Sequence, residues 1–192
     1  MWSTSLYEHP QPTLQWGAVL VASLIAALTD LRSRRIPNLL TGTLLLSGLA
    51  GSAIVSGLPG LADSLAATVL LAAPFVLLYA FAHGGAGDAK LMGAIGSWLG
   101  IVNGVAVLFA VSLCGVVLGV LFALSKGKLA PVLGNLTGTA KGLLRPVFGI
   151  GTYREAAGLI PAAGEGLQMP YGIAILLGTT FAAGGTWLWN IL

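Results

Sequence analysis

The sequence predicts an all-α fold, a polytopic integral membrane protein with about six transmembrane helices. Hydrophobic residues make up 56% of the 192 residues and charged residues only 8%, against about 25% in soluble domains. The mean hydropathy is +0.92, and a small soluble core cannot bury that much apolar surface. The apolar runs lack the alternation of barrel strands. Helices then remain as the structures that satisfy their own backbone hydrogen bonds in lipid.

Polar or glycine-rich breaks divide the chain into segments of about 20 residues, the length that crosses a bilayer. The breaks fall at RSRR, SGLPG (56–60), HGGAGD (83–88), Asn103-Gly104 and 126–168. We expect the spans to be roughly 14–30, 37–56, 61–82, 88–102, 104–125 and 169–192. They form a single membrane-embedded domain over 1–192. In it, 126–168 is a cytoplasmic or interfacial connecting segment, either resting on the inner leaflet or a simple loop.

Charge decides the path of the chain across the membrane. The span 88–102 is short, because its residues rise only about 22 Å against a hydrocarbon core of roughly 30 Å. If it crosses, every Lys and Arg lies on one side, in the loops 31–36, 83–90 and 126–168. The positive-inside rule makes this side cytoplasmic and puts both termini outside. The tryptophans agree, since all fall near the expected outer interface: Trp2, Trp16, Trp98, Trp187 and Trp189.

Composition excludes several kinds of site. Cys114 is the single cysteine, so the chain has no internal disulfide and no CxxC metal site. His9 and His83 are far apart in sequence and suggest no metal cluster, so we expect no metal and no cofactor. Topology accounts for the basic residues, so we expect no nucleic-acid partner. The first 31 residues contain no Lys or Arg that would make the basic region of a cleavable signal.

Two of the six acids, Asp30 and Asp88, differ from the others in position. The expected topology places both at the cytoplasmic membrane edge, where Asp30 ends the first span and Asp88 begins the fourth. Helices that cross in opposite senses can bring two such side chains together. Asp63 starts the third span on the outer side, where an acid suits a helix N-terminus, and we interpret it as structural. Glu155 and Glu165 lie in the long connecting segment, where solvated acids are ordinary.

Two carboxylates beside one water molecule can divide the work of hydrolysis. One, ionised, removes a proton from the water, and the other, protonated, donates a hydrogen bond to the substrate carbonyl. Two like charges held close together do not both ionise easily, so such a pair shares a proton. The chain offers no other nucleophile with a paired base.

Structural interpretations of the same residues stay open. Asp88 is also suited to be a simple helix N-cap, and Asp30 to pair with Arg34 or Arg32 one turn on. The glycines before Asp88 either form the turn into the helix or let an extended substrate backbone approach the carboxyl group. These glycines are Gly84, Gly85 and Gly87.

Three stretches carry a combined pattern: DLRSRRIPN from Asp30, GGAGDAKLMGAIGSWLG around Asp88, and MPYGIAI at 169–175. Together they resemble the type IV prepilin peptidases, polytopic aspartic proteases of the G-x-G-D class. The resemblance runs from the first span to the last. It implies that Asp30 and Asp88 are catalytic, and that other motif positions support them: Pro37, Asn38, Gly85, Gly87 and Lys90.

The resemblance also implies a substrate and a location. Such enzymes cleave the basic leader of prepilins or pseudopilins at the cytoplasmic edge of the bacterial inner membrane. The expected partners are the substrate helix in the bilayer and membrane lipid. The CxxC-bearing N-terminal extension of the larger members is missing, so the chain is similar to the short, peptidase-only form of Flp (Tad) pili, and N-methylation is not expected. Ala86 and Ala89 replace glycine and valine of the larger members and leave the aspartate intact.

Two other functions are alternatives to a protease. The first is a small ion- or proton-coupled membrane transporter subunit that uses Asp30 and Asp88 as ion sites. Transporters tend to place such groups near the midplane, between internal repeats, whereas both acids are expected at one edge here. The second is an inactive assembly scaffold, and the two intact aspartates argue against it.

Overall fold

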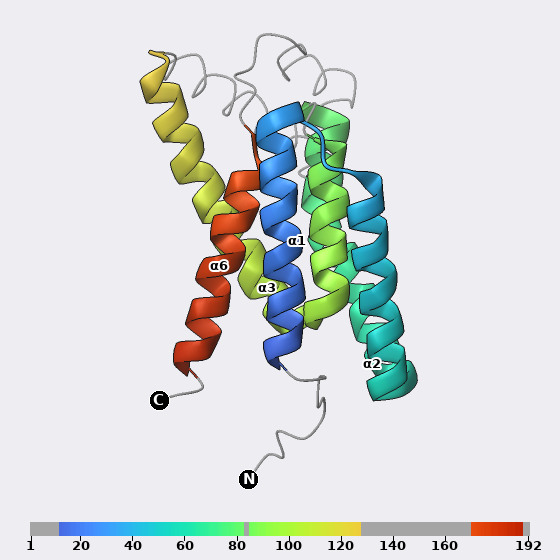
Figure 1. The fold of residues 1–192 in the computed structure, drawn as a ribbon. Helices are drawn as coiled ribbons and strands as arrows, with labels where there is room; N and C mark the ends of the chain where they lie inside the picture. Colours follow the sequence, from blue (N-terminus) through green and yellow to red (C-terminus); the bar gives the residue numbers. More distant parts are fainter. Residues whose placement is uncertain (1–11, 83–84, 128–169, 190–192) are drawn as a thin grey trace, which may run out of the picture.

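A computed structural model describes residues 12–82, 85–127 and 170–189, and within these ranges it contains helices and no strand. The all-α prediction is therefore confirmed. Figure 1 shows the helices packed as a bundle, with α6 beside α1. The four elements are α1 (Pro12–Ser33), α2 (Asn38–Ala82), α3 (Ala86–Ser125) and α6 (Gly172–Trp189). Of the predicted connecting segment 126–168, residues 128–168 lie outside the described ranges, as does Met169.

The long helix α2 folds back on itself at Gly57. This glycine has φ 63° and ψ −150°, a combination that essentially only glycine adopts. The hydroxyl of Ser64 donates to the hydroxyl of Ser52 at 2.6 Å. Twelve residues would separate the two serines by about 18 Å along a straight helix, so the halves on either side of Gly57 run antiparallel. The predicted break at SGLPG is confirmed.

Helix α3 reverses in the same way at Gly100, which has φ 68° and ψ −175°. Two glycines on either side of the break, Gly93 and Gly104, face neighbouring residues of α2. A Cβ on Gly93 would lie 3.4 Å from the side chain of Ala72, and one on Gly104 would lie 2.9 Å from Leu71. Both halves of α3 therefore pass the same level of α2. The break predicted at Asn103-Gly104 exists but lies at Gly100, and Gly104 itself is helical and serves close packing.

Among the described residues, three helices are long and apolar enough to cross a membrane, and a shorter apolar helix covers Gly172–Trp187. The three cover Thr13–Ser33, Asn38–Ala80 and Ala86–Ser125. The glycine breaks fall inside the second and third of them, at positions that divide each into two shorter helical segments. The path of about six crossings stays a prediction.

Small residues lie at the closest helix contacts, and large apolar side chains cover much of the outside. A Cβ added to Gly96 would lie 2.6 Å from the carbonyl oxygen of Ala67, so α3 and α2 touch backbone to backbone. In contrast, Ile54 is 83% exposed and Val102 is 84% exposed. Small residues at helix contacts and apolar side chains facing outward are typical of helix bundles in lipid. The chain is a membrane protein.

The end of α1 differs from its prediction by about one turn. The first span was expected to end at Asp30, but α1 continues to Ser33. The chain then leaves the helix through Arg34, which has φ 51° and donates its backbone N–H to the carbonyl oxygen of Asp30 at 2.8 Å. A left-handed residue is a common way to end a helix. Asp30 consequently lies within the last turn of α1.

Asp63 was expected to begin the third span, but it supports the N-terminus of a different helical segment. It lies within the second half of α2. Its Oδ1 accepts a hydrogen bond at 3.5 Å from the backbone N–H of Ile101, the first residue after the Gly100 break. Asp63 therefore supports the turn in α3, and it does not begin its own segment.

Candidate active site

Asp30 is buried between α1 and α6, with 8% of its surface exposed. Its Oδ2 accepts a hydrogen bond from the backbone N–H of Gly172 at 2.9 Å. Gly172 is the first residue of α6, and the first amide groups of a helix have no partner within that helix. The contact therefore satisfies one free amide and holds the carboxyl group of Asp30 in one orientation.

Position 172 has no room for a side chain. A Cβ there would lie 3.1 Å from both the Cβ and the Oδ2 of Asp30, and 3.2 Å from the Cα of Ala27. Glycine is thus required for a close approach, and α6 can begin directly against the last turns of α1.

Asp88 lies in the first turn of α3 and is partly buried. The N-cap of this helix is Gly85, whose carbonyl oxygen accepts the backbone N–H of Asp88 at 3.2 Å. No side chain caps the helix, so the alternative that Asp88 is a simple N-cap is wrong. A Cβ on Gly85 would overlap the carboxylate of Asp88. The first motif glycine therefore provides the space that the aspartate occupies.

The two aspartates interact electrostatically, so the carboxyl groups share one region of the molecule. They reach it from different elements, Asp30 from the end of α1 and Asp88 from the start of α3. The bundle thus brings together two side chains that are far apart in sequence, as the sequence predicts.

Tyr171, directly before α6, borders the same region. Burial raises the pKa of its phenol, and the charges of Asp88 and Cys114 raise it further. Its ring packs edge-on against Phe75, with centroids 5.8 Å apart, and its hydroxyl rests against Gly115, where a Cβ would overlap it. Tyr171 is therefore held between α2 and α3, within reach of the charge of Asp88.

The motif around Asp88 touches the I-P-N stretch that follows α1. A Cβ on Gly87 would lie 3.1 Å from the Cβ of Ile36, so the backbone of Gly87 packs closely against the side chain of Ile36. One helical turn further, the Nζ of Lys90 donates to the Oδ1 of Asn38 at 2.8 Å. The two contacts fix the start of α3 against the start of α2.

Every predicted site residue lies at this end of the bundle, but the contacts differ in kind. Gly85 lies against the carboxyl group of Asp88, which interacts electrostatically with Asp30, whereas Lys90 and Asn38 pair with each other. Pro37 contributes its carbonyl oxygen, which accepts the backbone N–H of Thr41 at 3.3 Å.

The residues alone do not predict the parts played by Gly172, Tyr171 and Ile36. A backbone donor such as Gly172 leaves no signature in its side chain. The P-Y-G start of α6 is the one signal that could direct attention to this position. Within the described ranges, no group of three His, Cys, Asp or Glu side chains could hold a metal ion.

Comparison with known protein families gives a match to the model described as the type IV leader peptidase family, over residues 18–120. This range is just over half of the 192 residues. It contains both aspartates, the I-P-N stretch and the two glycine breaks. No curated protein and no solved structure matches the chain.

Proposed function

Because the chain belongs to the type IV leader peptidase family and is therefore a membrane protease, we propose that Asp30 and Asp88 are its catalytic pair. The protein is then an aspartic endopeptidase. One observation carries the proposal: the two carboxyl groups interact in one partly buried region, and the chain there is built to accommodate them. Gly172 holds Asp30, and Gly85 leaves the volume that Asp88 fills.

Hydrolysis by this pair uses one water molecule and one shared proton. One carboxylate removes a proton from the water, and the resulting hydroxide attacks the carbonyl carbon of the scissile peptide. The other carboxyl group, protonated, donates a hydrogen bond to the carbonyl oxygen and stabilises the tetrahedral intermediate. When the C–N bond breaks, the proton taken from the water passes to the leaving amine. In Asp30, Oδ2 accepts the Gly172 amide, and the carboxylate keeps further acceptor positions for the water.

We further propose that the substrates are the leader peptides of type IV, Flp-type prepilins or pseudopilins. The motif stretches of the chain are similar to those of the short, peptidase-only enzymes that serve such pili. The substrate's apolar helix stays in the bilayer, and its leader reaches the pair from the cytoplasm. The protein lies in the bacterial inner membrane with both termini outside, and the arginines after Asp30 anchor the cytoplasmic end of α1.

The site region supports a protease better than the transporter alternative. Both aspartates lie at helix ends, Asp30 in the last turn of α1 and Asp88 in the first turn of α3. Ion sites of transporters are instead typically near the middle of the membrane.

Cleavage of a pilin precursor by the purified chain in lipid vesicles tests the proposal. Asp30→Asn and Asp88→Asn should each reduce the cleavage rate by about 10²–10⁴-fold, the usual contribution of acid–base groups. The matched control is Asp63→Asn, which makes the same change at the acid that supports the Gly100 turn and should leave cleavage nearly unchanged. Normal cleavage by either site variant, with insertion verified, would reject the catalytic pair.

A further inference from the structure

A groove with a cavity volume of about 520 Å³ lies between the two halves of α2 and the start of α3. Its apolar part is formed by Leu45, Ala72, Val76 and Ala94. Neither Asp30 nor Asp88 lines it. We call it the α2–α3 groove, and the peptidase chemistry leaves it without a role.

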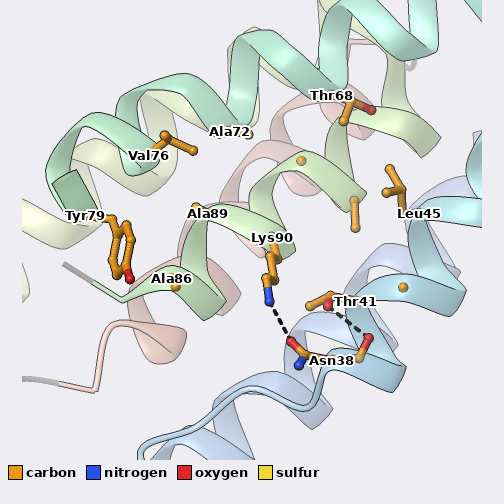
Figure 2. A pocket seen from close by; sticks show the side chains of 13 residues that line it. Asn38, Thr41, Leu45, Thr68, Ala72, Val76, Tyr79, Ala86, Ala89 and Lys90 are labelled. Atoms are coloured by element: carbon orange, nitrogen blue, oxygen red, sulfur yellow. Dashed lines mark hydrogen bonds between the residues drawn. The ribbon is translucent and has the colours of Figure 1, made fainter.

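The α2–α3 groove has one polar end. There the Nζ of Lys90 donates to the Oδ1 of Asn38 at 2.8 Å, and in Figure 2 the side chain of Tyr79 extends toward the same end. Tyr79 is 54% exposed, and Lys90 is exposed as well. An ammonium group has three N–H donors, so two remain for a ligand. The polar end therefore offers a positive charge and a hydroxyl group to an anion.

The polar end lies where the helices end, and the apolar part extends inward. Asn38 is the first residue of α2, and Lys90 lies one turn into α3. The groove follows α2 from Tyr79 back to Thr68, which is about 16 Å of helix. Half of a hydrocarbon core of roughly 30 Å is about 15 Å. The groove is thus as deep as a single leaflet, with its charge at the membrane edge.

We propose that the α2–α3 groove binds an anionic phospholipid, with one acyl chain along the apolar part and the phosphate at Lys90 and Tyr79. The order of polarity along the groove is that of a phospholipid, and basic pockets between helices at a membrane surface bind anionic headgroups. A transmembrane helix fits poorly, because one helical turn with its side chains occupies about 400–600 Å³. The groove has room for about one such turn. The proposal does not depend on the peptidase activity.

The charge at Lys90 is tested by native mass spectrometry of the full chain in detergent. Phosphatidylglycerol and phosphatidylethanolamine with identical acyl chains are added separately. The anionic lipid should bind about fivefold more tightly, the effect of one lysine at an anionic headgroup. Lys90→Gln should abolish this preference. Lys126→Gln removes a lysine charge at the exposed residue that follows α3. This variant should retain the preference for the anionic lipid. A preference that survives Lys90→Gln would overturn the proposal.

The acyl-chain part of the groove has its own test. Gly42 lines the groove, and a Cβ there would meet no atom within 4 Å, so Gly42→Leu starts from an open position and adds bulk to the groove. It should weaken the binding of both lipids by at least about tenfold, the loss expected when two methylene groups are displaced. Gly51 on the same half of α2 has equal space and does not line the groove. Gly51→Leu is therefore the control, and equal binding by the two variants would contradict the proposal.

A photoreactive phospholipid identifies the occupant in the unaltered protein. A diazirine on the acyl chain should label peptides that contain the groove residues Leu45, Ala72 or Val76. Labelling confined to other surfaces would overturn the proposal. In a separate variant that carries a photocrosslinking residue in place of Val76, capture of the pilin precursor or of a second copy of the chain instead of lipid would also overturn it.

Discussion

The backbone N–H of Gly172 donates to the Oδ2 of Asp30 at 2.9 Å, across 142 positions of sequence. This hydrogen bond joins the start of α6 to the last turn of α1 and orients a carboxyl group that we assign to catalysis. A contact made by a backbone amide is independent of side-chain chemistry. It depends on how closely the two helices approach, and the absence of a side chain at position 172 sets that distance.

Gly172→Ala should therefore impair cleavage while the protein still inserts. The new Cβ would lie 3.1 Å from the Oδ2 of Asp30, so the carboxyl group or the start of α6 must move. A displacement of about 1 Å in an active site can reduce the rate by about 10²-fold. Cleavage assays in vesicles measure the effect. Gly184→Ala, in open space on the same helix, is the control, and equal rates for the two variants would contradict the role of Gly172.

The contact between Gly87 and Ile36 predicts energetic coupling. Gly87→Ala places a Cβ 3.1 Å from the Cβ of Ile36, and crowding of this kind costs about 1–3 kcal/mol. Ile36→Gly removes the opposing atom, so the double variant should recover about 1 kcal/mol relative to the sum of the single changes. Unfolding in mixed micelles measures each corner of this cycle. Strict additivity would mean that the two positions do not meet in the folded protein.

Alanine substitutions at Gly57 and Gly100 should destabilise the protein, because alanine disfavours their backbone angles. We expect a loss of about 1–3 kcal/mol at each position, measured by unfolding in mixed micelles. Gly51→Ala is the matched control, since it lies on α2 with open space around it and improves helix propensity. Wild-type stability of the Gly57→Ala variant would show that α2 does not turn there.

The turn positions also show how much of the fold the residues predict. SGLPG indicates a break, and Gly57 makes one. Asn103-Gly104 also consists of residues that are typical of a break, yet the chain turns at Gly100. A glycine allows either an unusual backbone angle or a close contact, and the amino-acid sequence alone does not tell which of the two applies at a given position. Only the packing of Gly104 against Leu71 does so.

The candidate site likewise contains some residues that the sequence predicts and others that it does not. Asp30 and Asp88 are predictable, because carboxyl groups are rare in an apolar chain and have a recognisable chemistry. The hydrogen bond from Gly172 is not predictable in this way, since every residue except proline carries a backbone N–H. The acceptor of the Gly172 N–H depends on how α6 packs against α1, and this packing is a property of the whole bundle.

Tyr171 should give the protein a specific dependence on alkaline pH. In the unfolded chain the phenol ionises near pH 10, whereas burial and the nearby charges raise its pKa in the folded protein. Unfolding then releases a proton at alkaline pH, so stability is constant below about pH 10 and falls as the pH rises toward the folded pKa. Between pH 9 and 11, the melting temperature of the Tyr171→Phe variant should fall less than that of the wild-type protein. Parallel curves of melting temperature against pH for the two proteins would contradict this role of Tyr171.

The contact between Asp30 and Gly172 also has a consequence for the order of biosynthesis. The ribosome makes Asp30 early and Gly172 much later, after α2 and α3 have been completed. A nascent chain that holds only its earlier helices in the membrane lacks the Gly172 amide that orients Asp30. If Asp30 and Asp88 form the proposed catalytic pair, that site is assembled by a late segment, and partly made chains are expected to leave neighbouring membrane proteins uncut.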